Sequence, residues 1–255
     1  DFAQNQGKST GGFCASPYGN HSYILLTWQG QMSDVFTLAH ELGHAGHSKL
    51  SNEAQSIFGS GAYISTYFVE APSTMNELLL AHHLLKTNPD KRFRRWVLSS
   101  MVSNTYYHNF VTHLLEAAYQ REVYKLVDAG GGVQAETLNR IMGETLKKFW
   151  GDAVELTEGA ELTWMRQPHY YMGLYSYTYS AGLTVATQAC KRIEAEGQCA
   201  VDDWRSVLAS GGTKTPLELA RMAGVDISTD GPLLDTIETI GGYIDEICRL
   251  TEELA

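Results

Sequence analysis

The feature that most constrains this chain is the segment HELGH at positions 40–44. On an α-helix, residues four apart lie on one face, with Cβ atoms about 5–6 Å apart. His40 and His44 can therefore bind one Zn²⁺ ion together, because Zn–N bonds are about 2.0–2.1 Å long. Glu41 follows His40, and its carboxylate can take a proton from a water at the metal. The motif predicts a helix that carries a catalytic metal site.

The residues around the motif favour this helix. The preceding segment, positions 23–28, is rich in apolar and β-branched residues and predicts a short strand, which Gly30 ends. Ser33 and Asp34 offer an N-cap, and we expect the helix to run from about 34 to 50. Its apolar residues have helical spacing: Val35, Leu38, Ala39, Leu42 and Ala45. The alternative is an ordinary helix with two surface histidines.

Composition narrows the class of protein. A chain of 255 residues with 44% hydrophobic and 19% charged residues is typical of a soluble globular protein with a sizeable core. The net charge of -10 argues against general nucleic-acid binding. No apolar run of about 18 residues predicts a membrane span, and no signal peptide is recognisable. The four scattered cysteines, without a C-x-x-C pair, favour reduced thiols and a cytoplasmic location.

The rest of the chain is largely helical in pattern. We expect a mainly α protein with a small β-sheet, forming one domain over residues 1–255. Besides the metal-motif helix, helices are expected at 65–85, 91–128 (one long helix or two nearly collinear ones), 134–150, 168–187 and in two or three shorter segments at the end. Gly11–Cys14 is a candidate second strand, and a loop is expected from Ser56 to Gly61.

A catalytic zinc site needs a third protein ligand. His47 lies about two turns beyond His40 on the same helix, too far to complete the site, so a supporting or packing role is expected. The pattern H-E-x-x-H-x-x-G-x-x-H also fails, because position 47 is His and position 50 is Leu. Glu53 lies at the end of the helix. Glu70 is the better candidate, since a carboxylate in an apolar segment is costly unless it is paired or binds metal.

Glu77 lies on the same helical face as Glu70, seven residues further on. A carboxylate in that place could orient a metal-binding histidine through a hydrogen bond. The alternative is an ordinary carboxylate on the helix surface.

HELGHAGH followed by FVEAPSTMNE resembles the thimet oligopeptidase and oligoendopeptidase F family of zinc peptidases, and oligoendopeptidase F in particular. The likeness continues through GDAVELTEGAELTW, PHYYMGLYSYTYSAG and TPLELARMAGVD, so it covers nearly the whole chain. It implies a zincin-like catalytic domain of the neurolysin and oligoendopeptidase type. It also implies that His40, His44 and Glu70 bind Zn²⁺ and that Glu41 is the general base.

In this family a histidine and tyrosines from the late tyrosine-rich segment contact the substrate and its tetrahedral intermediate. The resemblance therefore implies such a role for His169, Tyr171 and Tyr175, whose N–H or O–H groups could donate to an oxyanion. If the segment is helical, Tyr171, Tyr175 and Tyr179 share one face. The alternative for at least half of the aromatic side chains here is simple packing.

One departure from the family concerns the start of the chain. Family members carry a large helical region before the zinc motif, which forms the other wall of a deep substrate channel. This chain begins just upstream of the motif. We expect it to be the C-terminal part of a longer protein, with that helical region as a partner; the alternative is a short form with a more open cleft.

The function expected from the sequence is zinc-dependent hydrolysis of internal peptide bonds in short oligopeptides. The strand at 23–28 or the segment 11–14 could hold the substrate backbone as an added strand. Two alternatives stay open: a fragment that binds zinc and peptide without turnover, and an exopeptidase of the same family. A purely structural zinc is disfavoured. In structural sites protein ligands usually occupy all four coordination positions, often as cysteines, and no cysteine lies near this helix in the sequence.

Overall fold

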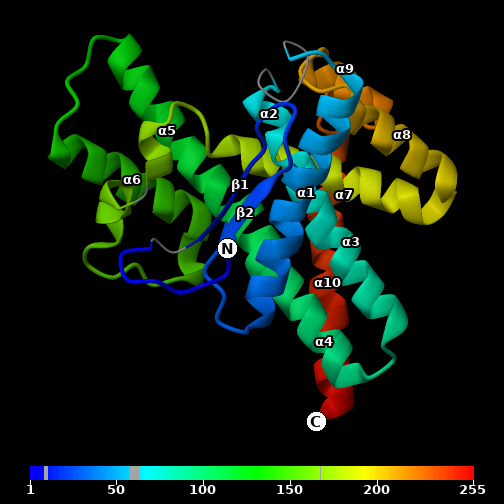
Figure 1. The fold of residues 1–255 in the computed structure, drawn as a ribbon. Helices are drawn as coiled ribbons and strands as arrows, with labels where there is room; N and C mark the ends of the chain where they lie inside the picture. Colours follow the sequence, from blue (N-terminus) through cyan, green and yellow to red (C-terminus); the bar gives the residue numbers. More distant parts are fainter. Residues whose placement is uncertain (9–10, 58–63, 167) are drawn as a thin grey trace.

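The computed structural model describes residues 1–8, 11–57, 64–166 and 168–255 (Figure 1). Its two strands are β1 (Gly12–Ala15) and β2 (Tyr23–Leu26). Its helices are α1 (Met32–Ala54), α2 (Thr66–Val69), α3 (Ala71–Thr87), α4 (Lys91–Ser100), the π-helix η2 (Met101–Thr112), α5 (His113–Asp128), α6 (Ala135–Trp150), the 3₁₀ helices η3 (Gly151–Ala153), η4 (Ala160–Met165) and η5 (Pro168–Tyr171), α7 (Tyr177–Glu196), α8 (Gln198–Ala209), α9 (Pro216–Met222) and α10 (Gly231–Leu254).

The prediction of a mainly α fold with a small sheet is confirmed. All four cysteines carry free thiols, as expected. Among the described helices, none combines the length and the apolar character that crossing a membrane requires. Positions 58–61 of the loop expected at Ser56–Gly61 lie outside the described residues.

The metal-motif helix is longer than expected at both ends. It begins at Met32 because the Asp34 carboxylate accepts the backbone N–H groups of Gln29 and Gln31, at 2.8 and 2.9 Å. Asp34 therefore caps the helix from inside its first turn, where a negative charge is favourable. The N-cap predicted at Ser33 or Asp34 is wrong, since Gln31 occupies that position.

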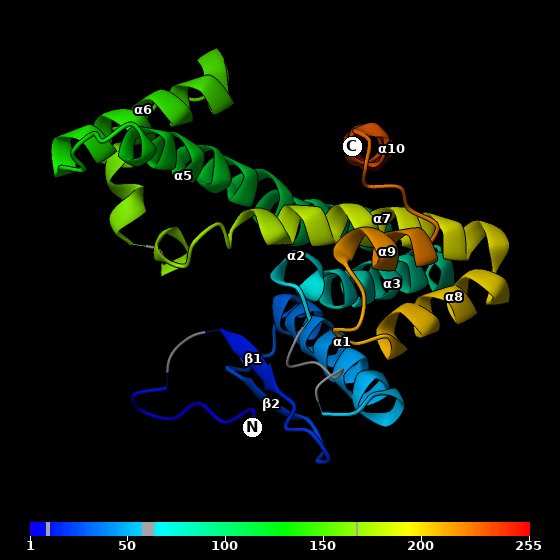
Figure 2. The ribbon, with the colours of Figure 1, turned by 90° about the horizontal axis from the view of Figure 1, so that it is seen from above.

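Both predicted strands form and pair as an antiparallel hairpin beside α1 (Figure 2). In its register Gly12 faces Leu26 and Ala15 faces Tyr23. The other edge of β2 is covered by the first residue: the Leu26 N–H donates to the Asp1 carbonyl at 2.9 Å, and the Asp1 ammonium donates to the Ile24 carbonyl at 2.7 Å. In the described part of the chain, β1 pairs with β2 alone.

Helix α3 lies in the middle of the fold, between α1 and α7 (Figure 2). Two glycines allow this close approach. A Cβ atom on Gly43 of α1 would lie 2.3 Å from the Pro72 carbonyl oxygen, and one on Gly182 of α7 would lie 2.8 Å from the Ala71 nitrogen. Helix backbones therefore meet on both sides of the start of α3. The core around them is fully buried and includes Phe68, Met75, Leu78, Leu183 and Val185.

The segment predicted as one long helix or two collinear ones, 91–128, is a helical run of three parts. Its middle part, η2, is a π-helix, with hydrogen bonds that span five residues. The wider turn places Thr105, Asn109 and Tyr106 in buried positions. Beyond it, α5 and α6 extend away from the main core (Figure 1) and share a second, smaller cluster of buried residues: Leu115, Tyr119, Ile141, Met142 and Leu146.

Two segments that were each predicted to be one helix are divided into two helices. The segment 65–85 divides into α2 and α3. Glu70 lies at the junction, where it is both the C-cap of α2 and the N-cap of α3. The tyrosine-rich segment 168–187 divides into η5 and α7. Gly173 between them has a φ of +68°, a conformation that ends a helix and favours glycine. Tyr171 and Tyr175 therefore do not share one helical face.

The close approach at Gly43 gives a stability prediction. Gly43→Ala should lower the free energy of unfolding by about 1–3 kcal/mol, because the added methyl group meets the backbone of Pro72 and not a movable side chain. The matched control is Gly46→Ala, one turn further on α1, where a Cβ has no neighbour within 4 Å. That change should leave stability equal or raise it by about 0.5–1 kcal/mol. Urea unfolding of the two variants compares them; equal effects would contradict the helix contact.

Candidate metal centre

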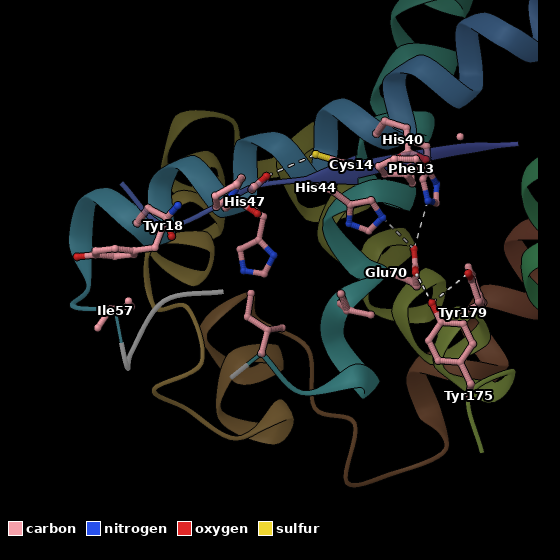
Figure 3. Close-up of a pocket in the computed structure, with 18 residues that line it drawn as sticks. Phe13, Cys14, Tyr18, His40, His44, His47, Ile57, Glu70, Tyr175 and Tyr179 are labelled. Atoms are coloured by element: carbon pink, nitrogen blue, oxygen red, sulfur yellow. Dashed lines mark hydrogen bonds and ion pairs between the residues drawn. The ribbon is translucent and has the colours of Figure 1, made fainter. Parts of the chain in front are cut away.

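Three candidate ligands from two parts of the chain meet at one point (Figure 3). His40 and His44 project from α1, and Glu70 lies between α2 and α3. The Glu70 Oε2 atom is 3.3 Å from His40 Nε2 and 3.4 Å from His44 Nε2. The two imidazole rings are 5.0 Å apart, and the ligand atoms of the three residues all lie within 4.8 Å of one another.

Glu70 is buried and held from several sides. Its side chain accepts a hydrogen bond from Ser73 Oγ on Oε2, at 2.8 Å, and one from Tyr175 Oη on Oε1, at 3.3 Å. Its backbone carbonyl accepts the hydroxyl groups of Ser73 and Thr74, at 2.9 and 2.7 Å. The first turn of α3 therefore fixes both the backbone and the carboxylate of Glu70, which restricts Oε2 to the side of the histidines.

His40 is oriented by Glu77, which lies two turns beyond Glu70, in α3. His40 Nδ1 lies 2.7 Å from Glu77 Oε1, and Thr105 Oγ1 donates to Glu77 Oε2 at 2.5 Å. A carboxylate can only accept here, so Nδ1 carries the proton and Nε2 faces Glu70. The idea that Glu77 is a surface carboxylate is wrong, because Glu77 is buried. Its contacts are those of a residue that orients a metal-binding histidine.

The cluster changes the pKa values of His40 and Glu70. Burial alone would lower the pKa of His40, but the hydrogen bonds and charges of Glu70 and Glu77 raise it to about 10. Burial alone would raise the pKa of Glu70, but both histidines hold it well below its usual range. Without a cation, a proton on His40 therefore compensates the negative charge of Glu70. Two imidazoles and a carboxylate converging on one point suit zinc, so the residues fit that metal.

Glu41 faces the same region from α1 but makes different contacts. Its side chain is only 5% exposed, and among the described residues its Oε2 atom has no hydrogen-bond partner. Burial raises the pKa of the Glu41 carboxyl, against the opposing effect of His40 and His44. A buried acceptor without a donor, in a cavity wall, is suited to receive a proton from a bound molecule.

The candidate ligands lie between two hollows. One cavity of about 710 Å³ is lined by His40, Glu41, His44 and Glu70, together with β1 and the tyrosines Tyr175 and Tyr179. A second of about 490 Å³ is lined by His40, Glu41, Glu77 and Tyr179, with residues of η2. His40, Glu41 and Tyr179 belong to both walls, so a long molecule lying over them could occupy both hollows.

Of the three site residues predicted in the tyrosine-rich segment, only some lie near the candidate ligands. Tyr175 lies in the cavity wall and contacts Glu70 (Figure 3). His169 is half-buried, and its ring is parallel to that of Tyr175, with centroids 5.5 Å apart. Tyr171 is 66% exposed and donates its hydroxyl to the Trp164 carbonyl, at 3.3 Å. The structure therefore brings Tyr175 to the cluster, keeps His169 directly behind it, and leaves Tyr171 outside.

Two residues near the cluster had not been proposed as site residues. Tyr179 Oη is 3.2 Å from Tyr175 Oη, and its four-residue spacing from Tyr175 was the available signal. His113 stacks on the Tyr179 ring at 4.4 Å, and burial lowers the pKa of His113 to about 4. Nothing in the sequence pointed to His113, because 66 positions separate it from Tyr179.

The two rejected third ligands lie apart from the cluster. His47 is buried, and burial lowers its pKa to about 4. It lines the larger cavity but is not among the converging ligand atoms, as the spacing predicted. Glu53 pairs with Lys49 at the exposed end of α1.

Comparisons with known proteins show relatives that match nearly the whole chain. Oligopeptidase PepF of Bacillus subtilis is 29% identical over 250 residues, which cover 98% of this chain and 37% of that protein. An oligoendopeptidase F homolog of Borreliella burgdorferi is 30% identical over 251 residues, covering 98% and 42%. The crystal structure of oligoendopeptidase-F from Enterococcus faecium superimposes with a TM-score of 0.71 at 25% identity, covering 88% of this chain and 41% of that one.

The chain thus spans about two fifths of the length of these relatives. The sequence pattern of one family, described as Peptidase family M3, matches residues 1–239. That match extends over both strands, the candidate metal ligands and the tyrosine-rich segment, and ends within α10. This chain therefore belongs to peptidase family M3.

Proposed function

We propose that this chain is the catalytic part of a zinc-dependent endopeptidase that hydrolyses internal bonds of short oligopeptides. The observation that carries the proposal is the convergence of His40, His44 and Glu70 beside the unpartnered carboxylate of Glu41. Membership of a peptidase family supports it, as do relatives named oligopeptidase and oligoendopeptidase.

In this proposal His40, His44 and Glu70 hold the zinc ion. When bound, zinc supplies Lewis acidity, which polarises a peptide carbonyl and acidifies water. Glu77 keeps Nε2 of His40 free to bind by holding the proton on Nδ1. Ser73 and Tyr175 keep the Glu70 carboxylate turned toward the two imidazoles.

Glu41 is the general base of the proposed reaction. Its carboxylate, in the cavity wall, accepts a proton from the attacking water while the water oxygen bonds to the carbonyl carbon. Glu41 then gives that proton to the amide nitrogen as the C–N bond breaks, so the amine leaves neutral. The raised pKa of Glu41 makes its carboxylate a stronger base than an exposed glutamate.

Tyr175 and Tyr179 are the proposed donors to the developing oxyanion, because both hydroxyl groups lie in the cavity wall beside Glu70. The Tyr175 hydroxyl, which donates to Glu70 in the free chain, would exchange that acceptor for the oxyanion. His169 supports Tyr175 by stacking on its ring, and a direct contact of His169 with substrate remains part of the proposal. Tyr171 is dropped from it, because its hydroxyl donates to Trp164 and its side chain faces solvent.

Strand β1 is the proposed site for the substrate backbone. Gly12, Phe13 and Cys14 line the larger cavity, while the far edge of β2 is occupied by Asp1. An extended peptide can therefore add to the β1 edge through backbone hydrogen bonds. Between the two stretches considered from the sequence, this geometry favours 11–14 over 23–28.

The hollows on both sides of His40 and Glu41 favour an endopeptidase over an exopeptidase. An exopeptidase needs a group that binds the chain terminus at a closed end of its cleft. Here, substrate could continue in both directions from the reacting bond. The second candidate function is binding of zinc and peptide without turnover. It is favoured by the coverage, because the chain spans only 37% of oligopeptidase PepF and 42% of the Borreliella burgdorferi homolog.

The first test is a Glu41→Gln variant assayed with a fluorogenic oligopeptide. It should lower kcat/KM by about 10²–10⁴-fold, since it removes the base, while zinc content is unchanged. Glu53→Gln, at the exposed end of the same helix, should keep full activity. Product masses should show cleavage at internal bonds. Zinc without turnover in the parent would favour the binding function, and release of single terminal residues would favour the exopeptidase.

Zinc binding should also release a proton. At pH 7 His40 is protonated, because its pKa is about 10, and it must lose that proton to bind metal; Glu70 is already ionised and releases none. The apparent zinc affinity should therefore rise roughly tenfold per pH unit below pH 10. Isothermal titration in buffers of different ionisation enthalpy counts the protons. A count of zero at pH 7 would contradict the raised pKa of His40.

Proline substitutions test the substrate strand. Successive N–H groups of β1 point to opposite sides, so one of Phe13→Pro and Cys14→Pro removes a donor toward the cavity. That variant should raise KM about 3–10-fold, the cost of one lost hydrogen bond, with zinc content unchanged. Unchanged KM in both variants would rule out β1 as the substrate strand.

A further inference from the structure

A second group of metal-binding side chains lies next to the tyrosines of the candidate site. His113 and Glu116 come from the start of α5, and His169 comes from η5. One ligand atom from each lies within 4.8 Å of the others. The group shares no residue with the His40, His44 and Glu70 cluster. The proposed reaction uses neither His113 nor Glu116, whereas His169 also belongs to the proposed function, where it stacks on Tyr175.

The hydrogen bond of His113 fixes which nitrogen is available. His113 Nδ1 lies 2.6 Å from the His108 carbonyl oxygen, which can only accept, so Nδ1 carries the proton. Nε2 is then an acceptor. The side chain is 1% exposed, and among the described residues Nε2 has no hydrogen-bond partner. A histidine that donates Nδ1–H to a backbone carbonyl and leaves Nε2 open has the arrangement typical of metal-bound histidines.

Glu116 adds a second buried acceptor on the same face of α5, one turn from His113. It is 4% exposed, and its Oε2 atom likewise has no partner among the described residues. Burial raises the pKa of the Glu116 carboxyl, and the Ser176 side chain beside it lowers that pKa. His113 Nε2 and Glu116 Oε2 themselves have no partner among the described residues, so part of their desolvation cost is uncompensated. A bound cation would satisfy both at once, and would also compensate the buried negative charge of Glu116.

The third member is held in place by α5 itself. Gln120, one further turn along, donates its Nε2 group to the Gly173 carbonyl at 2.6 Å and to the His169 carbonyl at 3.2 Å. These bonds attach the segment that carries His169 to α5. The His169 ring is 5.6 Å from that of His113. The three side chains therefore come from two segments that the fold joins by hydrogen bonds of its own.

We propose that His113, Glu116 and His169 form a second binding site for a divalent transition-metal cation, with zinc as its probe. Two imidazoles and one carboxylate are a donor set that zinc accepts readily, and no thiol or hard oxygen cluster is involved. Occupancy would tie the segment of His169 to α5. A metal ion at this site and the direct contact of His169 with substrate considered above are therefore alternatives. The proposal concerns binding alone and stands whether or not the chain hydrolyses peptides.

The test counts zinc ions per chain by elemental analysis after dialysis against buffered free Zn²⁺. The parent chain should hold two. A His113→Ala/Glu116→Gln variant should hold one, and a His44→Ala variant should keep the ion of the second site. His83→Ala, an exposed histidine of α3 outside both groups, is the matched control and should hold two. Far-UV circular dichroism checks folding, and Glu116→Gln alone replaces the double variant if that one unfolds.

The outcomes separate the two metal sites. One ion in the parent that survives His113→Ala/Glu116→Gln overturns the second site and shows that water satisfies its acceptors. Two ions retained by that variant, or undiminished affinity in Glu116→Gln, overturn it as well. In a further outcome, the parent holds a single ion that the His44→Ala variant retains and the His113→Ala/Glu116→Gln variant loses. That result would support the second site and count against the proposed catalytic zinc. No zinc in the folded parent overturns both.

Discussion

The candidate centre depends on the contact between helix α1 and the first turn of α3. Gly43 and Gly182 let α1 and α7 approach the backbone around Pro72 and Ala71. This contact brings Glu70, at the junction of α2 and α3, within 3.3–3.4 Å of two imidazoles. Any side chain at either glycine would separate the backbones, and the carboxylate would move with them. Helix packing, and not local sequence, thus sets the distance between the candidate ligands.

The contact between α1 and α3 buries three carboxylates. Glu41, Glu70 and Glu77 are each at most 5% exposed. They lie close together, since Glu70 and Glu77 both contact His40, the residue before Glu41. Isolated carboxylates in such positions would destabilise the fold, so each must be paired, hydrogen-bonded or used. Glu70 and Glu77 are compensated by His40, Ser73 and Thr105. The Oε2 atom of Glu41 is left without a described partner, which is what its proposed chemical role needs.

The π-helix η2 connects the two groups of candidate ligands. Through Thr105 it reaches Glu77 and so the His40 cluster. In its second half, the His108 carbonyl accepts a hydrogen bond from His113 Nδ1 and so orients His113 of the second group. A π-helix turns successive side chains by a different angle from an α-helix. The same stretch can therefore present polar groups to both sites within a helical run.

Much of this protein was predictable from local sequence. The HELGH spacing and the apolar period predicted the metal-motif helix, because neighbours on a helix are fixed by its geometry alone, although its N-cap was predicted wrongly. The short strands were likewise predictable from β-branched residues and glycines. Glu70 could be chosen because an acidic residue in an apolar segment calls for a compensating partner. The family resemblance pointed to the same residue.

What only the tertiary structure decided are the contacts between segments far apart in the chain. The break at Gly173 removes Tyr171 from the site, and Tyr179 lies beside Tyr175 in its wall. The meeting of His113 and Glu116 with His169 could not be read from spacing, since about fifty positions separate them. Periodicity reports only neighbours along one helix. Side chains from different elements meet where close-packed helices leave room, and that depends on every contact of the core at once.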